Sequence, residues 1–289
     1  MPFFSIIIPT YNRVNLIGAT IQSVIDQTFI DFELLIVDDG STDNTKEVID
    51  SYNDKRIQYI YQVNGERGKA RNNGVIHAKG KYVFFLDSDD LLYPDHLKHA
   101  AEKIKELNEP VFFHIRYEEI INKQKKAAET LYLSSIRKTI EKQNKFACQF
   151  FLKRDIALAF PFSENRDLKI GEDWEVILKI AVRYPINFSN EVHAAIVHHG
   201  ERSMEVASAE TILKSKIILL ENLKKDSKIS KRILQNVNAE LTSLAALAAS
   251  IAKKKKEAFK LLRKAVCMRK NMFFKRRTLA ILKKIIIGG

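Results

Sequence analysis

Apolar runs alternate with amphipathic segments along the first hundred residues of the chain. Runs rich in β-branched and aromatic residues predict strands, and apolar positions at helical spacing between them predict helices. This alternation is typical of an α/β fold with a doubly wound, mostly parallel, Rossmann-like sheet. The predicted strands are Phe3–Ile8, Phe32–Val37, Ile57–Gln62 and Tyr82–Leu86. The predicted helices run from Arg13 or Asn15 to Gln27, from Ser41 or Thr42 to Tyr52, and through Ala70–Asn73.

The pattern becomes less regular after residue 90 and helical near the end. We predict a helix at Asp95–Leu107, a strand at Val111–Ile121 and a polar excursion over 123–145. Segments Phe146–Leu152 and Ile156–Phe160 flank a turn, a helix begins at Gly171, and short strands follow at Ile186–Phe188 and Val192–Val197. From Ala207 the spacing is helical. These patterns predict a domain at 1–205 and a helical C-terminal region at 206–289.

Charge separates the end of the chain from its body. The chain has 48 Lys and Arg against 35 Asp and Glu, a net charge of +13. Residues 251–289 hold 14 of the basic residues and one acid, Glu257, so residues 1–250 are neutral overall. The excess charge therefore belongs to the C-terminal segment and says nothing about the chemistry of the body.

The location of the protein is suggested by what the sequence lacks. Two distant cysteines, Cys148 and Cys267, do not indicate a disulfide framework and favour a reducing compartment. The apolar run Ser5–Pro9 is too short for a signal peptide, and no run of about 18 apolar residues predicts a transmembrane helix. We therefore expect a cytoplasmic protein.

Three carboxylates follow the predicted strand Tyr82–Leu86, in the order Asp87-Ser88-Asp89-Asp90. In open α/β sheets, ligands bind at the edge formed by the carboxyl ends of the strands. Clustered carboxylates repel one another, and a hard divalent cation that bridges to phosphate oxygens relieves this repulsion. Asp and Ser also favour turns and helix caps, so the stretch alone is equally compatible with a solvated turn.

Other polar residues are expected near the same edge. Tyr11 and Arg13 follow the first strand, where an aromatic ring either stacks on a nucleobase or packs on its own helix. Asp39 follows the second strand and either accepts hydrogen bonds from a nucleoside or forms a turn. Arg71 precedes the acidic strand, where it either neutralises a diphosphate or pairs with a nearby carboxylate.

Two later stretches are also candidates. Acids stabilise a helix N-terminus, which is one interpretation of Glu172-Asp173 before Trp174; the other makes Asp173 a general base. His198 and His199 are adjacent, which is poor spacing for two ligands of one metal. One of them is a candidate contact for a diphosphate or a metal, although spacing alone favours an ordinary histidine.

Two common nucleotide-binding motifs are absent. Gly65-Glu66-Arg67-Gly68-Lys69 has too few residues between its glycines for a P-loop, and Ala70 follows the lysine. The first strand ends in Pro9-Thr10-Tyr11-Asn12, which is not the glycine-rich turn of a dinucleotide-binding fold.

Taken together, several stretches resemble glycosyltransferase family 2 in order and spacing over residues 3–100, and more loosely over 101–205. The stretches that carry the resemblance are Ile6–Arg13, Gln27–Phe29, Phe32–Ser41, Gly68–Gly74, Phe85–Asp90, Glu172-Asp173 and His199-Gly200. Members of this family are inverting transferases with a GT-A fold that use nucleotide-diphosphate sugars. One departure is His198, where many relatives carry an arginine.

The resemblance implies roles for particular residues. Residues 1–100 would form the nucleotide-sugar-binding half and 101–205 the acceptor-side half, with Glu172 and Trp174 near the acceptor. Asp89 would ligate Mn²⁺ or Mg²⁺, with Asp87 and His199 as further possible ligands, and Asp173 would be the catalytic base. Residues of the donor site would be Pro9, Tyr11, Arg13, Asp39, Arg71, Asp87 and Ser88. The acceptor would be a hydroxyl of a saccharide or of a lipid-linked sugar, in bacterial cell-surface polysaccharide synthesis, and the donor by default a UDP-sugar.

Two other functions compete with this interpretation. A sugar-nucleotide nucleotidyltransferase shares the sheet and the metal, but it ordinarily has a glycine-rich basic loop after the first strand, which this chain lacks. A catalytically dead sugar-nucleotide-binding or membrane-associated protein is the second. The joint presence of Asp39, Asp87, Asp89 and Asp173 argues against it.

The basic segment 251–289 is amphipathic. Apolar residues from Ala258 to Val266 and from Phe273 to Ile286 recur at helical spacing, opposite Lys and Arg. This pattern suits an anionic membrane surface, which predicts a peripheral protein on the inner face of the cytoplasmic membrane. The alternative is a helix packed on the body with a solvated basic face. We expect no nucleic-acid binding, because the segment lacks the interleaved aromatics of a stacking platform.

Overall fold

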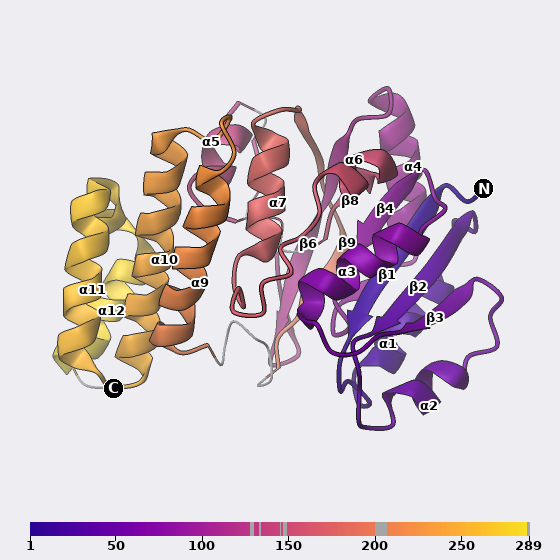
Figure 1. Cartoon of the computed structure of the whole chain (residues 1–289), viewed down its shortest axis with the longest axis horizontal. Helices are drawn as coiled ribbons and strands as arrows, with labels where there is room; N and C mark the ends of the chain where they lie inside the picture. Colours follow the sequence, from indigo (N-terminus) through magenta and orange to yellow (C-terminus); the bar gives the residue numbers. More distant parts are fainter. Residues whose placement is uncertain (128–129, 133, 145, 147–148, 200–206, 288–289) are drawn as a thin grey trace. The chain divides into compact units, whose positions relative to one another are not determined.

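The predicted alternation of strands and helices forms one mixed sheet in a computed structural model, which describes residues 1–127, 130–132, 134–144, 146, 149–199 and 207–287 (Figure 1). Cys148 and Gly200 lie outside these described residues, and Cys267 is an exposed free thiol. The chain divides into two units. The sheet unit comprises Met1–Ile136, Phe146–Glu164 and Tyr184–His199, and the helical unit comprises Arg137–Lys145, Asn165–Arg183 and Gly200–Gly289.

The strand order across the sheet is β3-β2-β1-β4-β8-β6-β9-β5, and β7 pairs with β6. Strands β1 to β4 are mutually parallel, as predicted. Strand β8 runs antiparallel to both β4 and β6, β9 is parallel to β6, and β5 is antiparallel to β9. The strands are β1 Phe4–Thr10, β2 Phe32–Asp38, β3 Ile57–Tyr61, β4 Tyr82–Phe85, β5 Leu91–Leu92, β6 Phe112–Ile121, β7 Gln124–Ala127, β8 Phe151–Lys153 and β9 Ile186–Val197.

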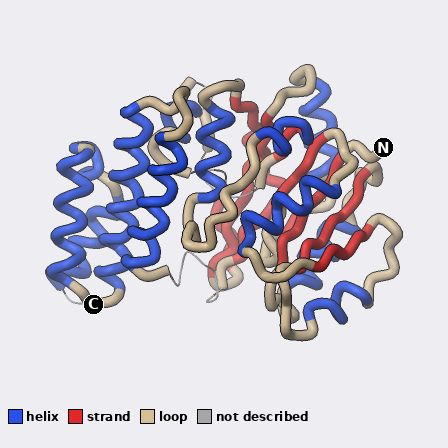
Figure 2. The backbone as a smooth tube through the Cα atoms, in the orientation of Figure 1, coloured by secondary structure: helices blue, strands red, loops and turns tan. Residues whose placement is uncertain are grey.

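Helices cover both faces of the sheet (Figure 2), which explains the continuous apolar runs of β1, β2 and β4. Ile6 and Ile8 of β1 share a core cluster with residues of α1 and α4. Ile7 faces α3, where a Cβ on Gly74 would lie 2.4 Å from Cγ2 of Ile7, so the glycine lets the helix approach the strand. The helices of the sheet unit are α1 Ile17–Ile25, α2 Thr45–Asp50, α3 Glu66–His77, α4 His96–Glu106 and α6 Arg154–Ala159.

The helical unit is built on α10, against which α9, α11 and α12 pack. Ser208 and Ser230 cap α9 and α10, each accepting a hydrogen bond from the backbone N–H three residues later. No helix in the described part of the chain combines the length and apolar character that crossing a bilayer requires. The helices are α5 Ile136–Ile140, α7 Glu172–Ala181, α9 Ala209–Lys224, α10 Lys231–Ile251, α11 Lys255–Met268, the 3₁₀-helix η1 Lys270–Phe274 and α12 Arg276–Ile287.

The structure differs from the sequence prediction in several places. The two short strands predicted within 186–197 form one strand, β9, which pairs along β6 with an irregularity near Arg116. The segment that follows the predicted turn after residue 152 is the helix α6, and β5 and β7 were not predicted. The predicted boundary at 205 also differs from the observed division. Helix α7 belongs to the helical unit because its apolar face packs on α9.

Candidate active site

The carboxyl ends of β1, β2, β3 and β4 meet at one edge of the sheet. Thr10, the last residue of β1, pairs with Asp38 of β2, which pairs in turn with Tyr61 of β3. On the other side, Ile7 pairs with Phe85, so the acidic stretch leaves β4 beside the end of β1. The topology thus gathers the residues that follow four different strands, as the sequence predicted.

The loops that follow β1 and β2 are cross-linked. Asn12 donates its backbone N–H to Ser41 Oγ at 2.9 Å, and Arg13 donates its own to Thr45 Oγ1 at 2.8 Å. Asp43 accepts from the backbone of Val14. Burial alone would raise the pKa of Asp43, but hydrogen bonds from Thr45 and Val14 outweigh it and lower that pKa. These bonds fix the loop that carries Tyr11.

Residues Pro9 and Tyr11 occupy contrasting positions on this loop. Pro9 is buried as the penultimate residue of β1, whereas the side chain of Tyr11 is 47% exposed. An exposed aromatic ring on a fixed loop is suited to stacking on a planar group. The structure therefore leaves Tyr11 available for the predicted contact with a nucleobase.

Asp39 is buried and accepts hydrogen bonds from the loop between β3 and α3. Its Oδ1 accepts hydrogen bonds from Gln62 Nε2 and from the backbone N–H of Gly65, each at 2.7 Å. Its Oδ2 accepts from Asn64 Nδ2 at 3.1 Å. Neighbouring Asp38 accepts from Tyr59 Oη; burial and this bond raise the pKa of the tyrosine. Sequence reasoning had not linked Gln62 or Asn64 to Asp39, because no local spacing joins them.

Arg71 pairs with Asp87. The guanidinium is 1% exposed, and its Nη2 lies 2.7 Å from Asp87 Oδ1, while the carboxylate is partly exposed. The guanidinium carbon also lies 5.2 Å from the ring centre of Phe162. Because the guanidinium of Arg71 is buried near Phe162 and paired with Asp87, it keeps a fixed positive charge beside the acidic stretch.

The acidic stretch forms a tight turn whose members differ in environment. The backbone N–H of Asp90 donates to the carbonyl of Asp87 at 3.1 Å, and Ser88 between them is buried. Asp89 Oδ2 lies 2.8 Å from His199 Nε2, so the fold brings the late histidine to the acidic stretch. His198, in contrast, continues β9 by donating its backbone N–H to Ile120.

Asp90 has a structural role that the sequence did not reveal. It is 1% exposed, its Oδ1 accepts from the backbone N–H of Val197 at 3.2 Å, and its Oδ2 accepts from Gln149 Nε2 at 2.9 Å. These bonds tie the end of β4 to β9. Only the fold brings residues 149 and 197 to Asp90, so no sequence signal identified them.

The predicted base lies in the helical unit. Asp173, in the first turn of α7, accepts from Asn144 Nδ2 at 2.7 Å through Oδ2 and from the backbone N–H of Trp174 through Oδ1. Glu172 and Trp174 are buried, and the indole N–H donates to the carbonyl of Ile140 at 2.8 Å. Trp174 therefore anchors α7 within its own unit, and the contact of either residue with an acceptor stays a prediction.

Residues 5–162 match the family model described as glycosyl transferase family 2. The chain belongs to glycosyl transferase family 2. A curated relative, an uncharacterized glycosyltransferase of Rickettsia felis, is 37% identical over 186 residues, which are 63% of this chain and 31% of that protein. The putative teichuronic acid biosynthesis glycosyltransferase TuaG of Bacillus subtilis is 41% identical over 108 residues, 36% of this chain and 43% of TuaG. The chain spans about a third of the length of the Rickettsia relative.

Solved structures of low identity share the fold. TarS from S. aureus, in complex with UDP-GlcNAc, superposes with a TM-score of 0.66 at 20% identity, covering 92% of this chain and 90% of that one. The mannosyltransferase PcManGT from Pyrobaculum calidifontis, in complex with GDP-Man and Mn²⁺, gives 0.60 at 18% identity, covering 100% and 88%. The family 2 chain therefore has a GT-A fold, which confirms the predicted fold class and family.

The acidic stretch of this family 2 protein has the donor set of a hard-cation site. One oxygen from each of Asp87, Asp89 and Asp90 lies within 4.8 Å of the others. Asp90 is buried and accepts hydrogen bonds through both oxygens, whereas Asp87 and Asp89 are partly exposed. Mg²⁺ and Mn²⁺ prefer oxygen ligands, and Mg²⁺ is typically held by one or two carboxylates together with substrate phosphates. The residues fit such an ion.

The apolar side of the basic segment 251–289 packs largely against other helices, which was the alternative to a membrane contact. Ala258, Leu262 and Ala265 of α11 and Ile281 of α12 are buried, and Leu262 and Ile281 share a cluster with Ala246 of α10. The predicted apolar stripe is therefore mostly occupied by the helical unit itself. Several apolar residues stay exposed, namely Phe259, Phe273, Phe274, Leu279 and Ile286.

Proposed function

We propose that this family 2 protein is a metal-dependent, inverting glycosyltransferase. It moves a sugar from a nucleotide-diphosphate sugar, a UDP-sugar by default, to a hydroxyl of a saccharide or lipid-linked acceptor. This sugar transfer would be one step in the synthesis of a bacterial cell-surface polysaccharide. Three similarities support this proposal: the family 2 match, the likeness to a putative teichuronic acid biosynthesis enzyme, and the shared fold with a UDP-GlcNAc complex.

The observation that carries the proposal is the arrangement around Asp87 and Asp89. Two carboxylates at the carboxyl edge of the sheet are each held by a basic side chain, Arg71 or His199. A divalent cation held by Asp87 and Asp89 would offset the charge of a diphosphate that leaves the sugar. Arg71 would add positive charge at the same carboxylates, and the imidazole of His199 lies at hydrogen-bond distance from Asp89.

The donor's nucleoside would lie on the neighbouring loops. Tyr11 would stack on the base, with Pro9 and Arg13 of the same loop beside it, and Asp39 would accept from the base or ribose. Oδ1 of Asp39 already accepts from Gln62 and Gly65, and Oδ2, which accepts from Asn64, would take the ligand donor as a second one. The present bonds show that the carboxylate is already positioned by its loop.

Asp173 would act as the base. Its carboxylate would take the proton of the acceptor hydroxyl as the acceptor oxygen forms its bond to the anomeric carbon. The bond from that carbon to the diphosphate breaks at the same time, with its electron pair leaving on the phosphate oxygen. A single displacement of this kind inverts the anomeric centre. Asn144, which donates to Asp173 Oδ2, would orient the carboxylate.

A thermal-shift screen of UDP-sugars and other nucleotide sugars, with and without Mn²⁺ or Mg²⁺, tests the donor site. A ligand that binds only the folded state raises the melting temperature by mass action. We expect one donor to give a metal-dependent shift that Asp89→Asn removes and that Asp31→Asn retains. Asp31 is the matched control because it is exposed at the amino end of β2, away from the site edge.

Product formation then separates the proposed enzyme from a dead binding protein. Asp173→Asn should abolish transfer to the acceptor while keeping the donor-induced shift. Normal turnover by this variant would remove Asp173 from the role of base. Release of inorganic diphosphate from a nucleoside triphosphate and a sugar phosphate would instead indicate a nucleotidyltransferase.

We further propose that the segment 251–289 binds the enzyme to the anionic inner face of the cytoplasmic membrane. The contact would be made by Phe273 and Phe274, which are 54% and 84% exposed and lie between Lys270 and Lys275. Exposed aromatics beside cationic residues bind anionic bilayers through apolar insertion and charge attraction.

Co-sedimentation with vesicles tests this contact. We expect binding to vesicles that contain phosphatidylglycerol and much weaker binding to vesicles of phosphatidylcholine alone. Exchanging both Phe273 and Phe274 for Ser should remove the binding, whereas Ile217→Ser, a change at an exposed apolar residue of α9, should not. Equal pelleting of all variants would refute the proposal.

A further inference from the structure

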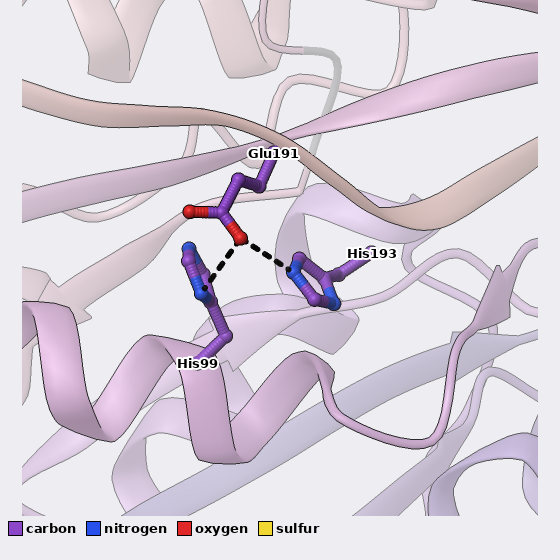
Figure 3. Close-up of side chains that lie close together, drawn as sticks. All are labelled: His99, Glu191 and His193. Carbon is purple, nitrogen blue, oxygen red and sulfur yellow. Dashed lines mark ion pairs between the residues drawn. The ribbon is translucent and has the colours of Figure 1, made fainter.

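A second cluster of ligand-type side chains lies on the sheet unit, between α4 and β9 (Figure 3). His99 comes from α4, and Glu191 and His193 come from β9. Oε2 of Glu191 lies 3.6 Å from His99 Nδ1 and 3.6 Å from His193 Nε2. The two imidazole rings stack, with their centres 4.4 Å apart.

We propose that His99, Glu191 and His193 form a binding site for a transition-metal cation of the Zn²⁺ type. The ligands would be Nδ1 of His99, Nε2 of His193 and a carboxylate oxygen of Glu191, with water in a fourth position. Two imidazoles and one carboxylate are a recurring protein ligand set for Zn²⁺, and this set differs from the all-oxygen set at Asp87 and Asp89.

The spacing of the three atoms is close to what a tetrahedral ion requires. Zn–N and Zn–O distances of about 2.0–2.1 Å place two ligand atoms about 3.4 Å apart at the tetrahedral angle. The two measured separations from Glu191 are 3.6 Å, and all three atoms lie within 4.8 Å of one another. At 3.6 Å neither contact is a hydrogen bond. An ion would therefore displace no hydrogen bond between Glu191 and either imidazole.

The surroundings of His99 suit a metal ligand. Its other ring nitrogen, Nε2, lies 2.8 Å from Ser189 Oγ, and this oxygen also accepts from the backbone N–H of Glu191 at 3.2 Å. Metal-bound histidines commonly donate their second N–H to such an oxygen, which fixes the ring and its tautomer.

One rearrangement follows from the geometry. The ring planes of His99 and His193 lie at 22°, whereas a metal binds in the plane of each ring. Binding thus requires His193 to turn out of the stack while Ser189 holds the ring of His99. His193 and Glu191 have room to adjust, since Glu191 is 63% exposed and His193 is partly exposed.

The cluster is separate from the candidate active site. Val197, which donates to Asp90, is four residues along β9 from His193, which corresponds to about 13 Å. The carbonyl of His193 accepts from the backbone of Tyr93 at 2.8 Å, just after β5. A metal in the cluster would therefore clamp α4 to β9 beside the segment that follows the acidic turn.

Metal titration of the whole chain tests the proposal. After treatment with a chelator, the protein would be titrated with Co²⁺, whose visible absorption reports imidazole ligands, and with Zn²⁺ as competitor. We expect one site that displays the Co²⁺ signal, is displaced by Zn²⁺, and raises the melting temperature. Glu191→Gln and His193→Gln should each remove the signal, and Ser189→Ala should weaken binding by about 10–100-fold.

Two controls separate this site from other metal binding. His77→Gln changes an exposed histidine of α3 and should leave the signal intact. Asp89→Asn should also leave it intact, although it removes the donor response proposed for the active site. Circular dichroism would show that the variants are folded. A Co²⁺ signal that persists in both Glu191→Gln and His193→Gln, or the absence of any such signal in the unchanged protein, would overturn the proposal.

Discussion

Replacing Gly74 with Ala probes how α3 brings Arg71 to the acidic turn. A Cβ at this position would lie 2.4 Å from Cγ2 and 3.2 Å from Cγ1 of Ile7. Carbon atoms in good contact are about 3.5–4.0 Å apart, so the helix or the strand must move by about 1 Å. Ile7 is fully buried and β-branched, which limits its ability to turn away.

The size of the effect follows from two opposing contributions. Overpacking of a core costs about 1–3 kcal/mol, and this close contact belongs at the upper end. Alanine returns roughly 1 kcal/mol because it favours the helix more than glycine does. We expect Gly74→Ala to lower the free energy of unfolding of the sheet unit by about 1–2 kcal/mol, or about 2–8 °C in melting temperature.

A functional loss should accompany the loss of stability. Arg71 lies one helical turn before Gly74, so a shift of α3 by about 1 Å moves the guanidinium relative to Asp87. Misplacement on this scale typically costs about 10²-fold in rate. Donor turnover by Gly74→Ala should therefore fall much further than its fraction of folded protein.

Urea unfolding followed by far-ultraviolet circular dichroism measures the stability change. The only tryptophan, Trp174, lies in the helical unit, so its fluorescence follows that unit separately. Gly18→Ala is the matched control, because a Cβ there would lie 3.4 Å from Tyr52 Oη and 3.6 Å from Val48. It should stabilise by up to about 1 kcal/mol. If Gly74→Ala proved at least as stable as the unchanged chain, α3 would not rest on β1 through this residue.

Three further predictions concern buried polar groups. Burial lowers the pKa of His114 to about 4, so the unfolded state binds more protons below pH about 6.5. Stability of the sheet unit should thus fall with decreasing pH between about 6.5 and 4, by up to about 1.4 kcal/mol per pH unit from this group. His114→Gln should reduce that slope in urea titrations, and an unchanged slope would contradict the assignment. Asp90→Ala removes the acceptor of the hydrogen bonds from the side chain of buried Gln149 and from the backbone of Val197, so it should cost about 2–4 kcal/mol in the same assay, whereas Asp89→Asn should cost little. Glu240→Gln removes the carboxylate that pairs with Lys275 and Arg277, and should lower stability of the helical unit, read by Trp174 fluorescence, by about 1–3 kcal/mol. This loss is smaller than the cost of about 3–5 kcal/mol for removing one partner of a fully buried ion pair, because Lys275 and Arg277 are each about a quarter exposed.

The parts of the fold that the sequence predicted well are those that burial alone determines. Strands β1, β2 and β4 are apolar because both faces of the sheet are covered, and their bounds agree with the apolar runs to within two residues. Strand β7, Gln124–Ala127, is polar and exists because it pairs with β6, so no periodicity marks it. Polar residues Ser189–Glu191 suggested a break in β9, but pairing with β6 carries the strand past them.

The candidate site was predictable to the extent that its residues follow strands. The parallel order of β1, β2 and β4 was enough to place Tyr11, Asp39 and Asp87 at one edge. The partners of the neighbouring Asp90 were not predictable, since Gln149 and Val197 reach it only through the pairing of β8 and β9. The amphipathic stripe of 258–266 was ambiguous for the same reason, because a membrane and a neighbouring helix select the same pattern.

The interleaving of the two units has a consequence for how the protein is made. The chain passes between the sheet unit and the helical unit five times, at residues 136, 145, 164, 183 and 199. When His199 has been synthesised, the sheet unit is complete, yet α7 with its buried face still lacks α9, on which it packs. Translation should therefore pass through a stage at which a finished sheet carries an uncovered apolar helix. Neither unit is one continuous stretch of the sequence, so gene fusion or recombination at a single point cannot transfer one unit without interrupting the other.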